Sequence, residues 1–261
     1  MVTTAEVSLY GKPMGVIVWD EQYGTGVFQY FPEFTLSRIE PAPLTMPVKD
    51  GEVYRFTNLN RQTYLGLPGL LADALPDAFG QELLNRWLSS QGRSFANPIE
   101  RLCYQGKRSM GAMEFAPSYS EHLEVSERVE MDSLVRVAAE MLSKKNELNT
   151  NLNDDKKEAI ASIIRVGTSA GGQRAKAVIA YNNETGEVRS GQVDAPAGFD
   201  YWLLKLDGVT NKELGDPEHF GEIEYIHYLL AKEAGIEMTE CRLLEENGRA
   251  HFMTRRLTRA L

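Results

Sequence analysis

A glycine-rich stretch between two apolar runs constrains this chain more than any other feature of its sequence. Residues 167–176 read Gly-Thr-Ser-Ala-Gly-Gly-Gln-Arg-Ala-Lys, and the apolar runs on either side are residues 159–166 and 177–181. Glycine permits backbone conformations that other residues avoid and lets amide N–H groups approach a ligand closely. Successive N–H groups in such a turn form a concave anion site, to which Arg174 and Lys176 add positive charge. The stretch therefore predicts a phosphate-binding loop.

A lysine inside a later apolar segment supports this interpretation. Lys205 ends the run Trp-Leu-Leu-Lys at 202–205, and a cation in an apolar strand needs an anionic partner. The loop matches none of the common nucleotide motifs: its second glycine is not followed by Lys and Ser or Thr as in a Walker A loop. Its spacing also differs from the protein-kinase and Rossmann patterns. On spacing alone, a flexible glycine hairpin beside a surface lysine fits as well as a phosphate site.

Composition limits the class of protein. A chain of 261 residues with 43% hydrophobic and 25% charged residues is typical of a soluble globular protein of one large or two modest domains. The net charge of −9 argues against a nucleic-acid-binding surface formed by this chain alone, because such surfaces are basic. No apolar run is long enough for a membrane span, and the start lacks the pattern of a signal peptide. Cys103 and Cys241 lack ligand spacing and are expected to be free thiols in a reducing, cytoplasmic setting.

Turn and periodicity signals predict an α+β protein in three parts. Residues 1–116 form a β-rich domain, with strands at 6–10, 14–19, 27–31 and 109–115 and helices at 70–74, 81–87 and 99–104, the second capped by Asp77. Residues 117–153 form a linker with a helix at 131–142. Residues 154–261 contain the glycine loop, followed by strands at 177–181, 187–190 and 199–206 and a helix at 222–234. A hairpin at 241–256 turns at Asn247-Gly248.

Several segments, in this order, resemble the HipA-type serine/threonine kinases, the toxins of bacterial type II toxin–antitoxin pairs. These segments are LPGLLADALPDAFG at 67–80, SMGA at 109–112, GTSAGG at 167–172, LLK at 203–205, EY at 224–225, LAKEAGI at 230–236 and RAHFMTRR at 249–256. Together they are more specific than any one of them. The resemblance implies an N-terminal HipA-type domain followed by a protein-kinase-like N-lobe.

The resemblance also implies roles for individual residues. Lys205 would bind the phosphates of the nucleotide and pair with Glu224, as kinases pair a lysine with a glutamate. Thr168 aligns with the family's autophosphorylation serine, and a shift of one residue would place Ser169 there instead. The predicted nucleotide-binding set is Gly171, Gly172, Gln173, Lys205, Glu224, Thr254, Arg255 and Leu257, the last three at a hinge that contacts adenine through backbone groups. Each of these two residues also has an alternative without a ligand. Lys205 could be a strand lysine whose ammonium reaches solvent, and Glu224 could be a glutamate that favours the helix dipole.

Two functions follow from the resemblance. In the first, the chain is an ATP- and Mg²⁺-dependent protein kinase toxin that phosphorylates a translation protein such as a tRNA synthetase and halts growth. A helix-turn-helix antitoxin of the HipB type would bind it and supply the DNA contacts. The family's catalytic and metal-binding aspartates lie in a C-lobe that we expect to fall beyond Leu261, the last residue. In the second, the chain is therefore an inactive, truncated remnant that binds a partner and nucleotide, and oligomerisation would cover an apolar lobe face.

Overall fold

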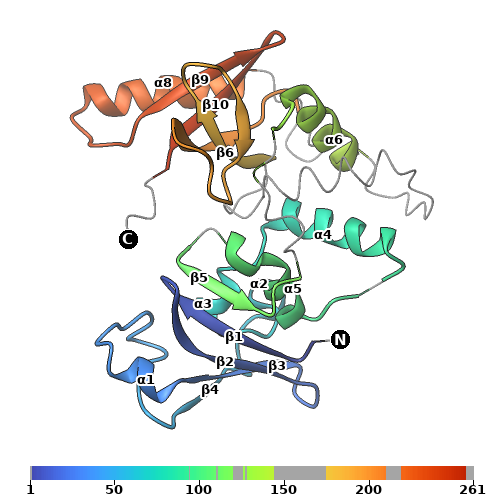
Figure 1. The fold of residues 1–261 in the computed structure, drawn as a ribbon, viewed down its shortest axis with the longest axis vertical. Coiled ribbons are helices and arrows are strands. Elements are labelled where there is room, and N and C mark those ends of the chain that lie inside the picture. The colour runs from blue at the N-terminus through green and yellow to red at the C-terminus, as the bar shows by residue number, and fades with distance from the viewer. Residues whose placement is uncertain are drawn as a thin grey trace. The chain divides into compact units, whose positions relative to one another are not determined.

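The computed structural model describes residues 2–93, 95–109, 111–119, 126, 128–143, 175–209 and 219–256. The chain divides into two compact units, and the division does not follow the order of the sequence. The first unit comprises Met1–Leu75 and Ser94–His122, and the second comprises Pro76–Arg93 and Leu123–Ala260. Each unit contains one five-stranded antiparallel sheet with helices, which confirms the predicted α+β class (Figure 1).

The first sheet is built mainly from hairpins between consecutive strands. Its strand order is β4-β3-β2-β1-β5. The strands are β1 (Thr4–Leu9), β2 (Lys12–Asp20), β3 (Thr25–Tyr30), β4 (Val53–Arg55) and β5 (Met113–Ala116). Gly11, with φ of +72°, turns the chain between β1 and β2. Large apolar side chains of β2 and β3 lie opposite one another, as in the pair Ile17–Phe28, and both of these are fully buried.

The first unit also contains short helices, several of which add buried residues to its core. They are α1 (Pro32–Thr35), α2 (Arg61–Tyr64), α3 (Gly69–Ala72), α5 (Pro98–Gln105) and a 3-10 turn at Gly106–Arg108. Helix α5 packs on β1, β2 and β5 through its buried residues Ile99, Leu102 and Cys103. Asn97 caps α5 by accepting a hydrogen bond from the N–H of Glu100 at 2.9 Å. Strand β4, helices α1 and α2 and the 3-10 turn are absent from the sequence prediction, and the other elements of this unit lie close to their predicted positions.

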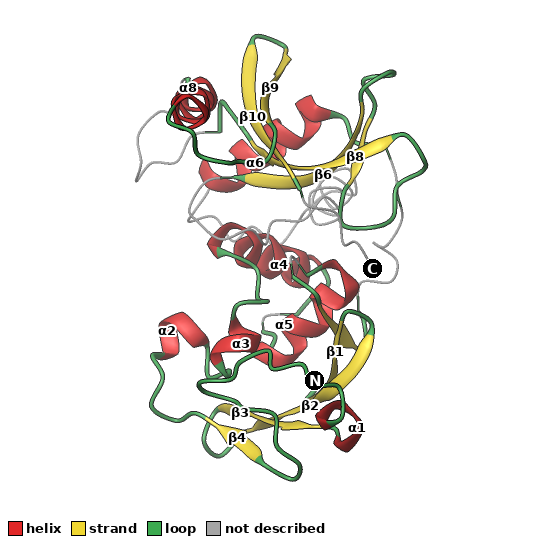
Figure 2. Ribbon diagram, turned by 90° about the vertical axis from the view of Figure 1, so that its left-hand side faces the viewer, coloured by secondary structure: helices red, strands yellow, loops and turns green. Residues whose placement is uncertain are grey.

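The second sheet has the strand order β7-β6-β8-β10-β9. Its strands are β6 (Lys176–Asn182), β7 (Val188–Ser190), β8 (Phe199–Lys205), β9 (Cys241–Glu246) and β10 (Arg249–Arg255). The hairpin between β9 and β10 turns at Asn247-Gly248, where both residues have positive φ, as a two-residue turn of this kind requires. Figure 2 shows these strands as one curved sheet with helix α6 against one face.

Helices from two distant parts of the chain close the core of this second unit. Helix α6 (Met131–Ser143) contributes Leu134, Val135 and Ala138, which pack against apolar residues of β6 and β8 such as Ile179 and Trp202. Helix α4 (Ala78–Ser90) adds the buried Leu83, with Trp87 packed beside it. Residues from the N-terminal third of the sequence are thus part of the core of the second unit.

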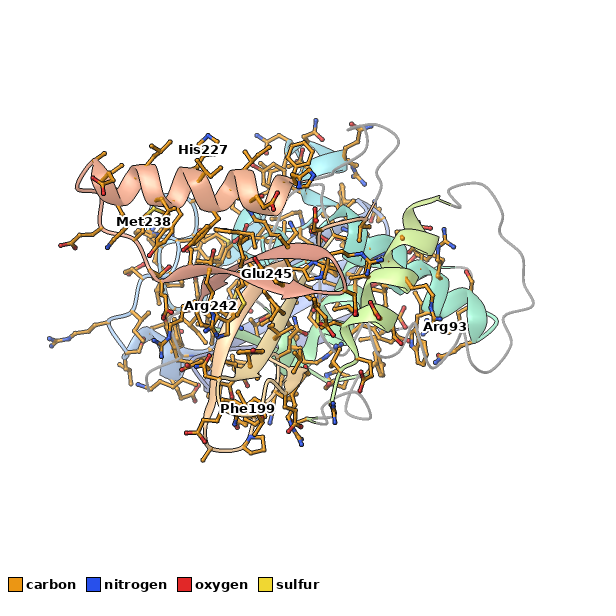
Figure 3. The ribbon with its side chains drawn as sticks, turned by 90° about the horizontal axis from the view of Figure 1, so that it is seen from above. Arg93, Phe199, His227, Met238, Arg242 and Glu245 are labelled. Atoms are coloured by element: carbon orange, nitrogen blue, oxygen red, sulfur yellow. The ribbon has the colours of Figure 1, made fainter. Side chains whose placement is uncertain are left out.

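Helix α8 (Phe220–Glu233) lies along β9 and β10 and meets β10 at its first turn. A Cβ atom built on Gly221 would lie 2.0 Å from the carbonyl oxygen of Ala250, so only glycine permits this approach. Gly235, with φ of +78°, ends the helix as predicted. Figure 3 shows His227 on the side of α8 that points away from the sheet. The helix leaves large apolar side chains 43–61% exposed, namely Ile223, Ile226, Leu229 and Leu230.

Candidate functional site

Lys205 is the last residue of β8, the central strand of the second sheet. In the sheet register it lies directly opposite Lys176 of β6 on one side and Phe252 of β10 on the other. Its ammonium nitrogen is 5.6 Å from the centre of the Phe252 ring, a distance at which a cation is attracted to the ring face. The Lys205 side chain is 39% exposed. The strand therefore supports the lysine stem while its charged end stays accessible.

Glu224 of α8 forms an ion pair and hydrogen bond with the ammonium group of Lys205. The close contact of Gly221 with β10 places the first turn of α8, and Glu224 follows one turn later. Because both side chains are partly exposed, the pair contributes at most about 1 kcal/mol to stability. An accessible ammonium oriented by a carboxylate is well suited to bind an anionic ligand. The pairing expected from the resemblance is thus present in the structure.

Lys176 has a different environment from the one that the sequence predicts. The sequence predicts that it adds charge to a phosphate site, whereas its ammonium lies 3.1 Å from Oδ2 of Asp77. These two side chains are 6% and 3% exposed. Asp77 also caps α4 through Oδ1, which accepts a hydrogen bond from the N–H of Gly80 at 2.9 Å. Lys176 is therefore neutralised by the carboxylate of Asp77, the N-cap residue of α4.

The end of β8 is held by a buried histidine of β10. The backbone N–H of Asp207 donates a hydrogen bond of 2.9 Å to Nδ1 of His251. Burial lowers the pKa of His251 below its usual value, which keeps the ring neutral and leaves Nδ1 free to accept. This contact fixes the backbone directly after Lys205.

The predicted hinge lies where β10 ends. The backbone N–H of Arg255 donates a hydrogen bond of 2.7 Å to the carbonyl oxygen of Glu240. The backbone N–H of Arg256 donates one of 2.8 Å to the carbonyl oxygen of Tyr201. The hydroxyl oxygen of Thr254 lies 3.5 Å from the sulfur of Cys241. The N–H groups of Arg255 and Arg256 are thus used within the sheet, so an adenine contact here would need other backbone groups. Both predicted free thiols, Cys103 and Cys241, are confirmed as free and buried.

The remaining predicted site residues lie outside the described part of the chain. These are Thr168, Ser169, Gly171, Gly172, Gln173 and Leu257. The described members of the predicted set are Lys205, Glu224, Thr254 and Arg255. No group of three or more His, Cys, Asp or Glu side chains among the described residues forms a metal site. None of the described helices has both the length and the apolar character needed to cross a membrane.

Comparison with known proteins gives the same assignment from both ends of the chain. Residues 5–116 match the model of the HipA N-terminal domain, and residues 168–261 match the model of the HipA-like C-terminal domain. The chain belongs to the HipA family. No curated protein matches it in the corresponding sequence search.

A solved structure has the same fold. It is a chain of the complex of HipA, HipB and operator DNA from the toxin–antitoxin system of Shewanella oneidensis MR-1. The two chains are 16% identical, with a TM-score of 0.59 over 97% of this chain. The match spans 50% of the length of the Shewanella chain. At this identity the likeness shows the fold of a HipA-family protein, and the activity of this chain must be argued from its own residues.

Proposed function

We propose that the second unit of this HipA-family chain binds the phosphates of ATP and acts within a protein serine/threonine kinase toxin. The observation that carries this proposal is the ion pair between Lys205 and Glu224. Protein kinases use a strand lysine, oriented by a helix glutamate, to bind nucleotide phosphates. In this chain the two residues come from a central strand and from the helix that packs on the neighbouring strands, and Lys205 remains 39% exposed.

The proposal extends to the residues around the pair. The glycine segment 167–172 precedes β6, the strand next to β8, and its N–H groups would bind phosphate oxygens. Thr168 or Ser169 would be the autophosphorylation site, because a phosphate there would compete with the nucleotide for this space. ATP with Mg²⁺ supplies the transferable phosphoryl group, and a translation protein such as a tRNA synthetase would accept it.

We further propose a HipB-type antitoxin as partner, with DNA bound only through it. The Shewanella relative occurs in a complex with HipB and operator DNA. The net charge of −9 agrees with DNA contacts made by a partner rather than by this chain. The exposed apolar side chains of α8, among them Ile226 and Leu230, support an interaction with another polypeptide, whether a partner or a second copy.

The test is a thermal shift with Mg-ATP, run beside an assay of labelled phosphate transfer. Mg-ATP at ten times its dissociation constant stabilises the folded state by about 1.4 kcal/mol, which raises the melting temperature by about 4 °C. Lys205→Met should abolish this shift. Lys232→Met is the matched control, because Lys232 is an exposed lysine of α8.

Each result has a defined meaning. A shift lost only in Lys205→Met, with phosphate transferred, supports the kinase proposal in full. A shift without transfer supports a nucleotide-binding chain that is catalytically inactive, the alternative that the sequence left open. Equal behaviour of wild type and Lys205→Met would show that the lysine does not bind nucleotide and would overturn the proposal.

A further inference from the structure

The ion pair between Lys176 and Asp77 is deeply buried in the second unit. Both side chains are more than nine-tenths buried, and the charged atoms lie 3.1 Å apart. Removing one member of such a pair leaves the other charge buried and uncompensated, which is strongly destabilising. Stability alone does not explain the pair, since an apolar pair of similar volume is often as stable. Its position in the sheet suggests another role.

Lys176 and Lys205 lie directly opposite one another on β6 and β8. Opposed residues of antiparallel strands point to the same face of the sheet, and like charges in that arrangement repel. In this structure each lysine has its own carboxylate: Asp77 for Lys176 and Glu224 for Lys205. Asp77 thus satisfies the lysine that would otherwise repel Lys205 and compete for its anionic partners.

The element that carries Asp77 is firmly held. Asp77 is the N-cap of α4, and Leu83 of the same helix is buried in the core that contains Ile179 of β6 and Leu204 of β8. Asp77 also lies within the region that matches the HipA N-terminal domain, although it belongs to the second compact unit. A residue of the N-terminal sequence therefore neutralises the first residue of β6, Lys176.

We propose that Asp77 is a positioning residue for the nucleotide site. By pairing with Lys176 it anchors the start of β6 and leaves Lys205 as the ammonium that meets phosphate. This inference rests on the proposed function. It assigns a role in ATP binding to a residue that does not contact ATP, and it gives Lys176 a structural role instead of the ligand role that its sequence position suggests.

The experiment is a double-mutant cycle in the full chain, with Asp77→Asn, Lys176→Met and the double variant. Asparagine caps a helix as well as aspartate does, so Asp77→Asn removes the charge and keeps the cap. We expect each single variant to weaken Mg-ATP binding by on the order of tenfold, and the double variant to bind no more weakly than either. Asp77→Asn should lower the melting temperature by about 10 °C, and the double variant should regain most of that loss.

A second measurement does not depend on ATP. Hydrogen exchange of the β6 backbone amides should become faster in Asp77→Asn than in wild type. Asp73→Asn is the control, because Asp73 is an exposed aspartate four residues earlier in the chain, and it should leave the exchange unchanged. If wild type itself does not bind Mg-ATP, the proposed function fails. The exchange rates then decide separately whether Asp77 anchors β6.

Several results would overturn the inference. Tighter Mg-ATP binding by Asp77→Asn, with loss in Lys176→Met, would make Lys176 a phosphate ligand that Asp77 restrains. Losses that multiply in the double variant would mean that the two residues act independently. Unchanged affinity in all three variants would reduce the pair to a purely structural contact. Unchanged exchange of the β6 amides in Asp77→Asn would remove the anchoring role.

Discussion

The central strands of the two sheets place different kinds of side chain opposite one another. In the first sheet, Ile17 of β2 lies opposite Phe28 of β3, and both side chains are fully buried. In the second sheet, Lys176 of β6 lies opposite Lys205 of β8, and each has its own carboxylate partner. Apolar pairs across a sheet stabilise it directly, whereas opposed lysines destabilise it unless they are neutralised. The first centre is explained by packing alone, whereas the second agrees with the phosphate site proposed above.

The difference also extends to how the two units are assembled. The first core uses residues from its own strands and short helices. The second core takes Leu83 from α4, a helix that precedes the last part of the first unit in the sequence. The unit that carries the candidate site therefore depends on a distant segment for both packing and charge. Perturbations of the two sheets should accordingly have different consequences.

The largest effect is expected from Phe28→Ala in the first sheet. Phe28 is fully buried, with its ring edge-on to Tyr30 at a centroid distance of 4.9 Å. Truncation should cost about 4 kcal/mol of unfolding free energy, measured by urea unfolding and by hydrogen exchange at β2 and β3. Mg-ATP affinity should stay unchanged at temperatures where the variant is folded. Val53→Ala, at an exposed position of β4, should cost less than about 0.5 kcal/mol.

A smaller but more informative effect is expected from Gly221→Ala in the second unit. The added methyl group would overlap the carbonyl oxygen of Ala250, so α8 must shift at a cost of about 2 kcal/mol. Because α8 carries Glu224, Mg-ATP affinity should fall together with the melting temperature. Gly111→Ala is the control, since nothing lies within 4 Å of a Cβ atom there. A destabilised Gly221→Ala variant with full affinity would separate the position of α8 from ligand binding.

The smallest effect concerns pH and also belongs to the second unit. Burial lowers the pKa of His251 in the folded state, whereas its unfolded value is about 6.5. The unfolded chain therefore binds the proton more readily than the folded chain. The contribution of neutral His251 to the free energy of unfolding is complete above pH 6.5 and declines as the pH falls through the usual histidine range. Melting temperatures recorded between pH 7.5 and 5 should fall less steeply in His251→Asn. The control is His227→Asn, at an exposed position of α8.

Much of the fold follows from local signals in the sequence. The turn at Asn247-Gly248 and the cap at Asp77 are found as predicted, because each depends on residues adjacent in the chain. Strand β4 and helix α2 have three and four residues, too few for a periodic pattern to emerge. Asn60, which caps α2 through hydrogen bonds to the N–H groups of Gln62 and Thr63, was the one available signal.

The candidate site was predictable only in part. Lys205 stood out because a cation interrupts an apolar strand, and the family resemblance suggested Glu224 as its partner. The pairing of Lys176 with Asp77 was not predictable from spacing, because it joins sequence positions that only the tertiary fold brings together. A basic residue beside a glycine loop suggests a ligand, and only its buried surroundings show that its charge is already neutralised.

The most direct test of the account is a calorimetric titration of Mg-ATP into wild type, Lys205→Met, Glu224→Gln and the double variant. The account predicts that wild type binds, that Lys205→Met loses binding beyond detection, and that Glu224→Gln weakens it by about tenfold. The double variant should resemble Lys205→Met, since the glutamate acts through the lysine. Equal affinity in wild type and Lys205→Met would contradict the central claim that this lysine, oriented by Glu224, is the phosphate-binding group of the chain.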